Sequence, residues 1–144
     1  MTPDRTTVEK SLDEACEELY RHAKRYIDEK AHERTIVAAV ILPFLTKSFP
    51  TWSVDPDYNR EGAKMKRNPK KDLHGKLIVP DIVVHEWGPN GRNLVAAQVK
   101  GYWNKEDRAE DEDKLRRLAA KHHYSYLYRI ELGKDDFEII PVFE

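Results

Sequence analysis

The sequence is poor in cysteine and has no long apolar run. Cys16 is the one cysteine among 144 residues, so no disulfide can form within the chain, and a reducing compartment is the natural setting. No run approaches the roughly 18 apolar residues of a membrane span. The first twenty residues are charged and lack the apolar core of a signal peptide. We therefore expect a cytoplasmic protein with no membrane partner.

The chain also lacks an excess of charge of either sign. It has 25 Lys and Arg against 26 Asp and Glu, a net charge of −1, which disfavours a strongly basic coat protein but permits a local basic groove. Hydrophobic residues make up 40% and charged residues 35%, which predicts one globular domain over residues 1–144. No Gly-rich phosphate loop, HExxH zinc motif or cysteine-nucleophile motif is visible.

The apolar periodicity predicts the order of elements. Pro43 falls inside the second expected helix and should kink it, because proline removes a backbone hydrogen bond. The order predicts an α/β fold with a central mixed sheet flanked by helices. The expected elements are helices at about 8–28, 32–48 and 107–121, strands at 52–58, 77–87, 93–103, 125–132 and 137–143, and a long polar loop before residue 77.

The stretch LVAAQVK, residues 94–100, has the composition of a buried strand but ends in two polar residues. Gln98 and Lys100 are two positions apart, so their side chains point to the same face of the strand. Burying the amide alone without a partner costs about 2 kcal/mol or more. Either both side chains reach solvent, or they are present for chemistry.

The register of the central hairpin decides which residues meet this pair. If Glu86 pairs with Asn93 across the turn GPNG, the residue numbers of antiparallel partners add up to 179. This register places Asp81 opposite Gln98. Asp81, Gln98 and Lys100 then converge on one face at one end of the sheet. A slip of one residue would separate them onto two faces.

This convergence suits a hard divalent cation. Mg²⁺ or Mn²⁺ prefers oxygen ligands, and a carboxylate lying ~5 Å from a second oxygen donor can share one. Lys100 could hold the attacking water or stabilise developing negative charge. Glu33 is a candidate for a further carboxylate, because it lies on the apolar stripe of the second expected helix, with Ile36 and Val40.

Pro80-Asp81, followed after sixteen residues by Gln98-Val99-Lys100, resembles the bipartite motif of the PD-(D/E)XK nuclease superfamily. The resemblance covers about residues 30–130 and leaves 1–29 outside it as a leader helix. It implies a restriction-endonuclease-like core, with Glu33 as the helix carboxylate and Asp81 as the central metal ligand. It also implies Gln98 at the (D/E) position, Lys100 as the motif lysine, and Mg²⁺ or Mn²⁺ as cofactor. The segments that carry it, in the order seen in a group of small nuclease-like proteins, are HERTIVAAVILPFL, VDPDYNREG, VPDIVVHEWG, NLVAAQVK and DEDKLRRLA.

Gln98 departs from that pattern, because glutamine offers a carbonyl oxygen without a charge and should weaken metal binding. Other interpretations also stay open: Asp81 as a turn residue at a strand entry, Glu33 as a cap of its own helix, and Gln98 and Lys100 as strand-end residues in water. The function predicted is a divalent-metal-dependent phosphodiester hydrolase acting on nucleic acid. The alternative is a catalytically weakened nuclease-like module for nucleic-acid binding or protein assembly.

The expected partner is nucleic acid, DNA more readily than RNA. A homodimer is also compatible with the sequence. Lys66, Arg67, Lys70 and Lys71 fall in the expected polar loop, where they could follow a phosphate backbone or form a solvated charge run. Trp103 follows Lys100 closely and could stack on a base or pack under the helix at 107–121. His85 shares the predicted face of Asp81, where it could touch phosphate or be a core histidine.

Overall fold

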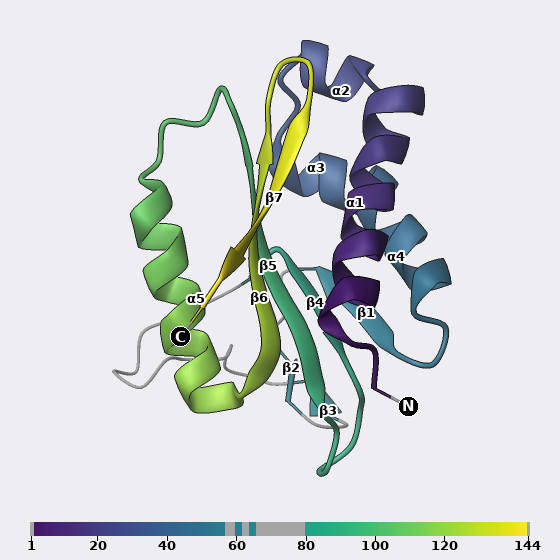
Figure 1. Cartoon of the computed structure of the whole chain (residues 1–144), viewed down its shortest axis with the longest axis vertical. Coiled ribbons are helices and arrows are strands. Elements are labelled where there is room, and N and C mark those ends of the chain that lie inside the picture. The colour runs from purple at the N-terminus through teal and green to yellow at the C-terminus, as the bar shows by residue number, and fades with distance from the viewer. Residues whose placement is uncertain (1, 57–59, 62–63, 66–79, 144) are drawn as a thin grey trace.

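A computed structural model describes residues 2–56, 60–61, 64–65 and 80–143 of the chain (Figure 1). It confirms the α/β class, with a five-stranded mixed sheet in the order β1-β4-β5-β6-β7. The pair β5–β6 is parallel and the other neighbours are antiparallel. The strands of this sheet are β1 (Ser53–Pro56), β4 (Ile82–His85), β5 (Asn93–Gly101), β6 (Tyr124–Leu132) and β7 (Phe137–Val142), and a separate antiparallel pair is formed by β2 (Arg60–Glu61) and β3 (Lys64–Met65).

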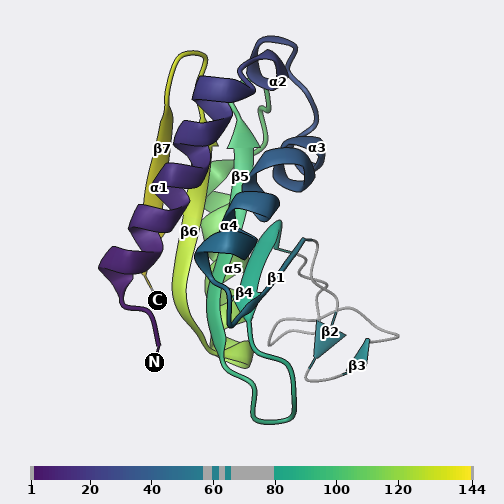
Figure 2. The ribbon, with the colours of Figure 1, turned by 90° about the vertical axis from the view of Figure 1, so that its right-hand side faces the viewer.

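Helices flank both faces of the sheet, as the pattern predicts. Figures 1 and 2 show α1, α3 and α4 over one face and α5 over the other. The described helices are α1 (Arg5–His22), α2 (Arg25–Asp28), α3 (Glu33–Ile36), the π-helical turn η1 (Val37–Ile41), α4 (Leu42–Ser48) and α5 (Arg108–His122). No helix among the described residues is long and apolar enough to cross a membrane.

The first predicted helix, 8–28, is divided in the structure into α1 and α2. Asp4 caps α1, where its Oδ1 accepts the Thr7 N–H at 2.8 Å, and this bond lowers the pKa of Asp4. The expected apolar stripe is buried against the sheet, and burial raises the pKa of the Cys16 thiol to about 12. The buried residues of α1 are Val8, Leu12, Ala15, Cys16 and Leu19.

The second predicted helix runs from α3 through η1 into α4. The distortion expected from Pro43 takes the form of η1, in which the Leu42 N–H donates to the Val37 carbonyl five residues back. A proline lacks an N–H and its ring crowds the carbonyl four residues earlier, so a wider turn before it relieves both problems. Helix α4 then ends at Ser48, before Phe49 and Pro50.

The two sheet faces bury different sets of residues. The larger core joins α1, α2, α3, η1 and α4 to one face. The smaller core joins α5 to the other face, and its members are Val83, Ala96, Leu115, Leu118, Ala119, Tyr124, Leu127 and Val142. Alternation along β5 therefore places Ala96 toward α5 and its neighbours Val95 and Ala97 toward the larger core.

The predicted register of the central hairpin is confirmed for the pairs from Ile82 to Val84, and the predicted pair Asp81–Gln98 lies one residue beyond the ladder. Ile82 pairs with Ala97 and Val84 with Val95, both sums of 179. The predicted pairing of Glu86 with Asn93 is wrong, because His85 lies opposite Asn93 and the Glu86 N–H donates to the Arg92 carbonyl. The shift is a β-bulge that adds one residue, Leu94, to β5 beside the turn.

Candidate functional site

The end of β5 extends past its antiparallel neighbour. Within the described residues the ladder between β4 and β5 ends at Ile82 and Ala97, whereas β5 continues to Gly101. On the other side β5 stays paired with β6 through Gly101 and Leu132. Amide groups at alternate residues point to the same side of a strand, so the N–H groups of Val99 and Gly101 both point to the β4 side.

Two carboxylates accept these two amide hydrogens. Asp81 Oδ2 accepts the Val99 N–H at 2.7 Å, and Glu33 Oε2 accepts the Gly101 N–H at 3.1 Å. The two amides are two residues apart, about 7 Å along the strand. A side chain from the entry of β4 and one from the start of α3 are thereby brought to the same edge of β5, an arrangement visible in the position of α3 beside the end of β5 (Figure 2).

Glu33 reaches the strand from a buried position at the first turn of its helix. It is 8% exposed, and its carboxylate also accepts the Asn104 Nδ2–H at 3.2 Å. The cap of α3 is His32 instead, whose Nδ1 accepts the Arg34 N–H at 3.2 Å. The bonds of Glu33 thus tie α3 to the end of β5.

Gln98 and Lys100 lie on the α5 face of β5, the face of Ala96. Gln98 is 8% exposed and the side chain of Lys100 is 13% exposed, so neither extends into solvent. The register places Asp81, one residue before Ile82, beside Gln98, one residue after Ala97. The structure therefore brings together Glu33, Asp81, Gln98 and Lys100 at one end of β5.

The Lys100 ammonium lies between two carboxylates that sequence reasoning did not assign to the site. Its Nζ donates to Glu106 Oε2 at 3.2 Å and lies 3.8 Å from Asp111 Oδ2. The bond from Lys100 lowers the pKa of Glu106. Burial raises the pKa of Asp111, although the positive charge of Lys100 acts in the opposite direction.

The turn after β5 connects the Glu33 carboxylate with the Lys100 ammonium. Asn104 donates from Nδ2 to Glu33 Oε2 and, at 3.4 Å, to Glu106 Oε1, while its Oδ1 accepts the Glu106 N–H at 2.9 Å. Arg108 fixes the turn from α5 by donating to the carbonyls of Gly101, Asn104 and Glu106. Glu33 and Lys100 are therefore linked through Asn104 and Glu106.

The sequence signals for these additional residues differ in strength. Asp111 precedes Leu115 by four residues and Leu118 by seven, so it stands on the apolar stripe of α5. The same reasoning singled out Glu33, and it would have found Asp111. No comparable signal marks Asn104 or Glu106, because their roles depend on the path of the turn.

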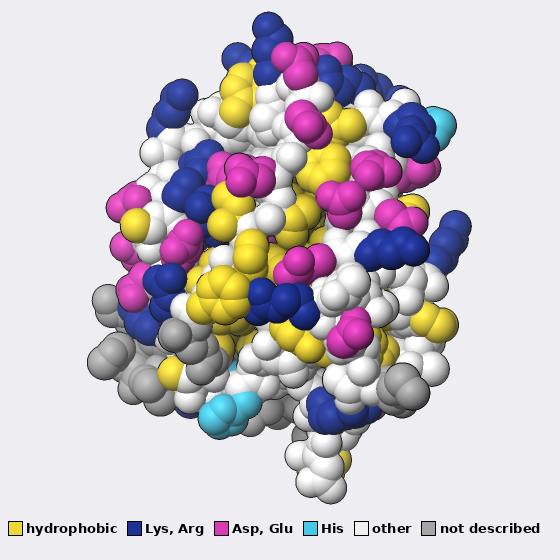
Figure 3. Space-filling view, viewed as in Figure 1, with side chains coloured by type: hydrophobic (Ala, Val, Ile, Leu, Met, Phe, Trp, Pro, Cys, Tyr) yellow, Lys and Arg dark blue, Asp and Glu magenta, His cyan; other side chains and the backbone are white. Residues whose placement is uncertain are grey.

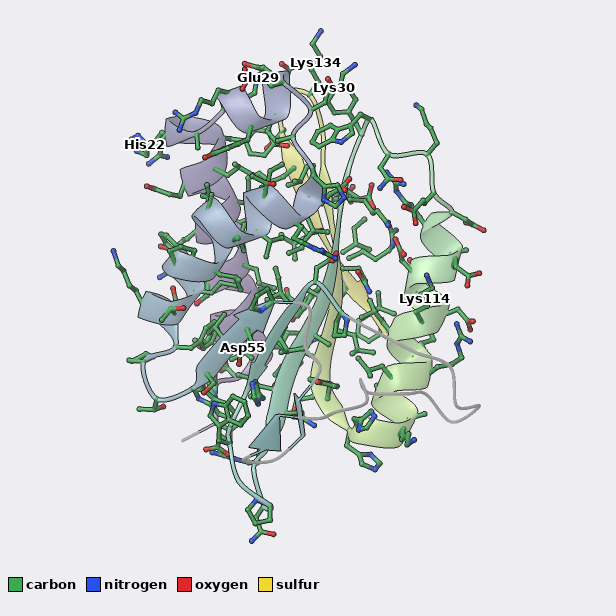
Figure 4. All side chains as sticks on the ribbon, turned by 180° about the vertical axis from the view of Figure 1, so that it is seen from behind. His22, Glu29, Lys30, Asp55, Lys114 and Lys134 are labelled. Atoms are coloured by element: carbon green, nitrogen blue, oxygen red, sulfur yellow. The ribbon has the colours of Figure 1, made fainter. Side chains whose placement is uncertain are left out.

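His85 is a buried histidine that is paired with a carboxylate. Its Nε2 lies 2.8 Å from Asp55 Oδ2, and its ring meets the edge of Trp87 with centroids 4.9 Å apart. Asp55 projects from β1, opposite Val83 (Figure 4). His85 has no exposed surface, which fits the core interpretation of this residue.

The predicted nucleic-acid contacts fall mostly outside the described residues. This is where Lys66, Arg67, Lys70 and Lys71 lie. Trp103 is half-buried against the larger core, with its ring over Gly101 and at the edge of Tyr102, centroids 5.3 Å apart. The option that it packs under α5 is therefore wrong. On the face in Figure 3, basic and acidic side chains are interspersed.

The donor set at the end of β5 consists of oxygen atoms from two carboxylates and one amide. Over residues 2–56, 60–61, 64–65 and 80–143, no three His, Cys, Asp or Glu side chains converge closely enough to hold a metal ion. Comparisons with family models, with curated proteins and with solved structures found no match to this chain. The chemistry open to the site therefore has to follow from its own residues.

Proposed function

We propose that this protein is a divalent-metal-dependent phosphodiester hydrolase that acts on nucleic acid, built on a PD-(D/E)XK-like core. The observation that carries the proposal is that Asp81 and Glu33 accept the N–H groups of two alternate residues of β5, beside Gln98 and Lys100. Carboxylates from two separate elements converge there on the strand that carries the amide and the ammonium. Packing alone gives no reason to gather four such side chains at one strand end.

The donor set fits a hard cation. Each carboxylate has two oxygens with about four acceptor positions, so one bond to a backbone amide does not exhaust it. Asp81, Glu33 and the Gln98 carbonyl would hold Mg²⁺ or Mn²⁺, and such an ion would neutralise phosphate charge and acidify a bound water. With two negative charges instead of three, this site should bind the ion more weakly than one with an acid at position 98.

Lys100 supplies the positive charge that the chain itself brings to the reaction. Its ammonium lies at the end of β5, two residues from Gln98, and has three donors that can orient a water or a phosphate oxygen. A donor held in place before the reaction stabilises charge that develops on the phosphate without reorganisation. The expected substrate is nucleic acid, DNA more readily than RNA, and the basic residues Lys66, Arg67, Lys70 and Lys71 suit the phosphates of either.

Calorimetric titration with Mn²⁺ tests the proposal directly. The wild type should bind Mn²⁺, and Asp81→Asn and Glu33→Gln should each weaken binding by about tenfold or more, since a charged oxygen is lost. Glu86→Gln is the matched control: it also removes one carboxylate charge, at the far end of β4 where Glu86 pairs with Arg92. Unchanged Mn²⁺ affinity in both site variants would reject the metal site.

A second candidate is a nuclease-like module that binds nucleic acid or assembles with protein without cleavage. Two observations favour it: Gln98 is neutral, and the Lys100 ammonium is already bonded to Glu106. Incubating the wild type with a labelled DNA duplex and Mn²⁺ separates the candidates. Cleavage that Asp81→Asn abolishes supports the hydrolase, whereas retention of the duplex without cleavage supports the module.

A further inference from the structure

Asp111 is a buried carboxylate with an unusual environment. It is 3% exposed and occupies the first turn of α5, and its Oδ2 accepts no hydrogen bond from the described residues. Buried polar atoms are nearly always hydrogen-bonded, because leaving one without a partner costs free energy. The nearest cation to this oxygen is Lys100 Nζ, at 3.8 Å.

The two carboxylates beside Lys100 differ sharply in exposure. The side chain of Glu106 is 65% exposed, whereas that of Asp111 is 4% exposed. Water screens an exposed ion pair and competes for its hydrogen bond, so such pairs are weak and exchange readily. An attraction inside the protein is screened much less. Lys100 thus has a persistent partner on its inner side and a replaceable partner on its outer side.

We propose that Asp111 is a positioning residue that holds the Lys100 ammonium at the end of β5, and that Glu106 is an exchangeable partner whose place a substrate phosphate takes. This inference rests on the proposed function, because it assigns the outer side of Lys100 to the phosphodiester. Carboxylate and phosphate oxygens both accept charge-assisted bonds from an ammonium. The three donors of Nζ let it serve Asp111 and one outer anion together.

The geometry explains why an inner partner is needed. A lysine side chain has four rotatable bonds, and its strongly hydrated head moves to water unless a partner holds it. With Glu106 alone, the ammonium would follow an exposed carboxylate on the solvent side of the pair. With Asp111 fixed on α5, release of Glu106 leaves Lys100 in place to meet the incoming phosphate.

Nitrogen-15 NMR of lysine ammonium groups tests the anchor without any metal. An ammonium signal is seen when its protons exchange slowly with water, and the Lys100 signal is identified by its absence in Lys100→Arg. We expect the signal in the wild type and in Glu106→Gln, and its loss in Asp111→Asn. Glu106→Gln is the matched control, since it removes the same charge from the same lysine. Persistence of the signal in Asp111→Asn, or its loss in both variants, would overturn the proposal.

Binding of dimethyl phosphate, a minimal phosphodiester, tests the exchangeable role of Glu106. Removing the competing carboxylate in Glu106→Gln should tighten binding about fivefold, whereas Asp111→Asn should weaken it about tenfold, as loss of a charge-assisted hydrogen bond does. Equal effects of the same sign would reject the division of roles. If Asp111→Asn does not fold, Asp111→Ser serves in both experiments.

These measurements separate the inference from the proposed function. Neither the ammonium signal nor dimethyl phosphate binding requires a divalent ion or cleavage. If both variants behave as expected but the wild type binds no Mn²⁺, the role of Asp111 is supported and the hydrolase is rejected. If the wild type binds Mn²⁺ and cleaves DNA, but the Lys100 signal is unchanged in Asp111→Asn, the hydrolase is supported and the role of Asp111 is rejected.

Discussion

The two faces of the sheet satisfy their buried polar groups in different ways. On the face under α1, the Tyr128 hydroxyl donates to Glu9 Oε2 at 3.0 Å, and the Tyr20 hydroxyl donates to the Gly133 carbonyl at 2.6 Å. Burial raises the pKa of both phenols, which stay neutral donors. On the α5 face, Asp111 keeps an oxygen without a hydrogen bond among the described residues. These hydroxyls of the first face are thus paired, whereas the second face leaves one buried carboxylate oxygen without a hydrogen bond among the described residues.

The largest expected effect on stability comes from a cavity in the larger core. Leu12 is 1% exposed within the larger core, so Leu12→Ala should lower the free energy of unfolding by about 2–5 kcal/mol through lost burial and a residual cavity. Urea denaturation measures the change. Phe143→Ala, at a side chain that is 58% exposed, is the control and should change it far less. Similar losses in both variants would remove the distinction between core and surface.

Gly101→Ala should have the next largest effect, because it crowds the Trp103 ring, which packs against the larger core. A methyl group at Gly101 would collide with the Trp103 ring, and such overpacking costs about 1–3 kcal/mol. The displacement should also weaken Mn²⁺ binding, since the Gly101 N–H holds Glu33. Replacing the ring by a smaller side chain in the double variant Gly101→Ala/Trp103→Leu should restore part of the stability. Full stability in Gly101→Ala would show that the Trp103 ring moves aside without a cost in free energy.

Gln98→Glu adds a negative charge to the α5 face. The side chains are nearly isosteric, and the new carboxylate should tighten Mn²⁺ binding about tenfold, since a hard cation prefers an ionised oxygen. Without metal the variant should melt at a lower temperature, because the charge lies near Asp81, and Mn²⁺ should reverse that loss. Calorimetry and melting curves measure both. Unimproved binding would mean that Gln98 does not face the cation, and would favour the module.

Asp111→Asn should show a smaller effect with a defined pH dependence. The folded-state pKa of Asp111 is raised above its ordinary value of 3.8, so the folded protein holds this proton more tightly than the unfolded chain. Stability then falls as the pH rises through that pKa, and the ionised carboxylate is a cost at pH 7. The variant should therefore melt at a higher temperature than the wild type at pH 7, and the difference should vanish below about pH 4. A lower melting temperature at pH 7 would contradict this.

The smallest expected effect on stability comes from four basic residues. Replacing Lys66, Arg67, Lys70 and Lys71 by alanine should leave the melting temperature nearly unchanged, because lysine and arginine side chains are seldom part of a core. The slope of log affinity for duplex DNA against log salt should fall by about 0.9 for each phosphate that the variant no longer neutralises. Fluorescence anisotropy at several salt concentrations measures the slope. An unchanged slope would mean that these four residues do not contact the nucleic acid.

Local patterns predicted most elements because local forces decide them. The stripe of α1, the strand of LVAAQVK and the helix over Leu115 and Leu118 follow from the spacing of apolar residues. Boundaries were harder. The break between α1 and α2 carries no strong signal, and of the strand predicted at 77–87 the described residues 80–87 form a strand only over Ile82–His85.

The class of fold and the apolar stripes follow from the sequence alone, because the period of two in strands and of 3.6 in helices defines which residues share a face. The register was predictable only in part, since the pairs from Ile82 to Val84 depend on the bulge at Leu94, which the turn did not predict. The rest of the site depends on the tertiary structure. The bonds of Glu33 to Gly101 and Asn104, and the place of Lys100 between Glu106 and Asp111, join residues whose meeting depends on how α3 and α5 pack on the end of β5. Spacing along a chain defines a face, but packing between elements defines which faces touch.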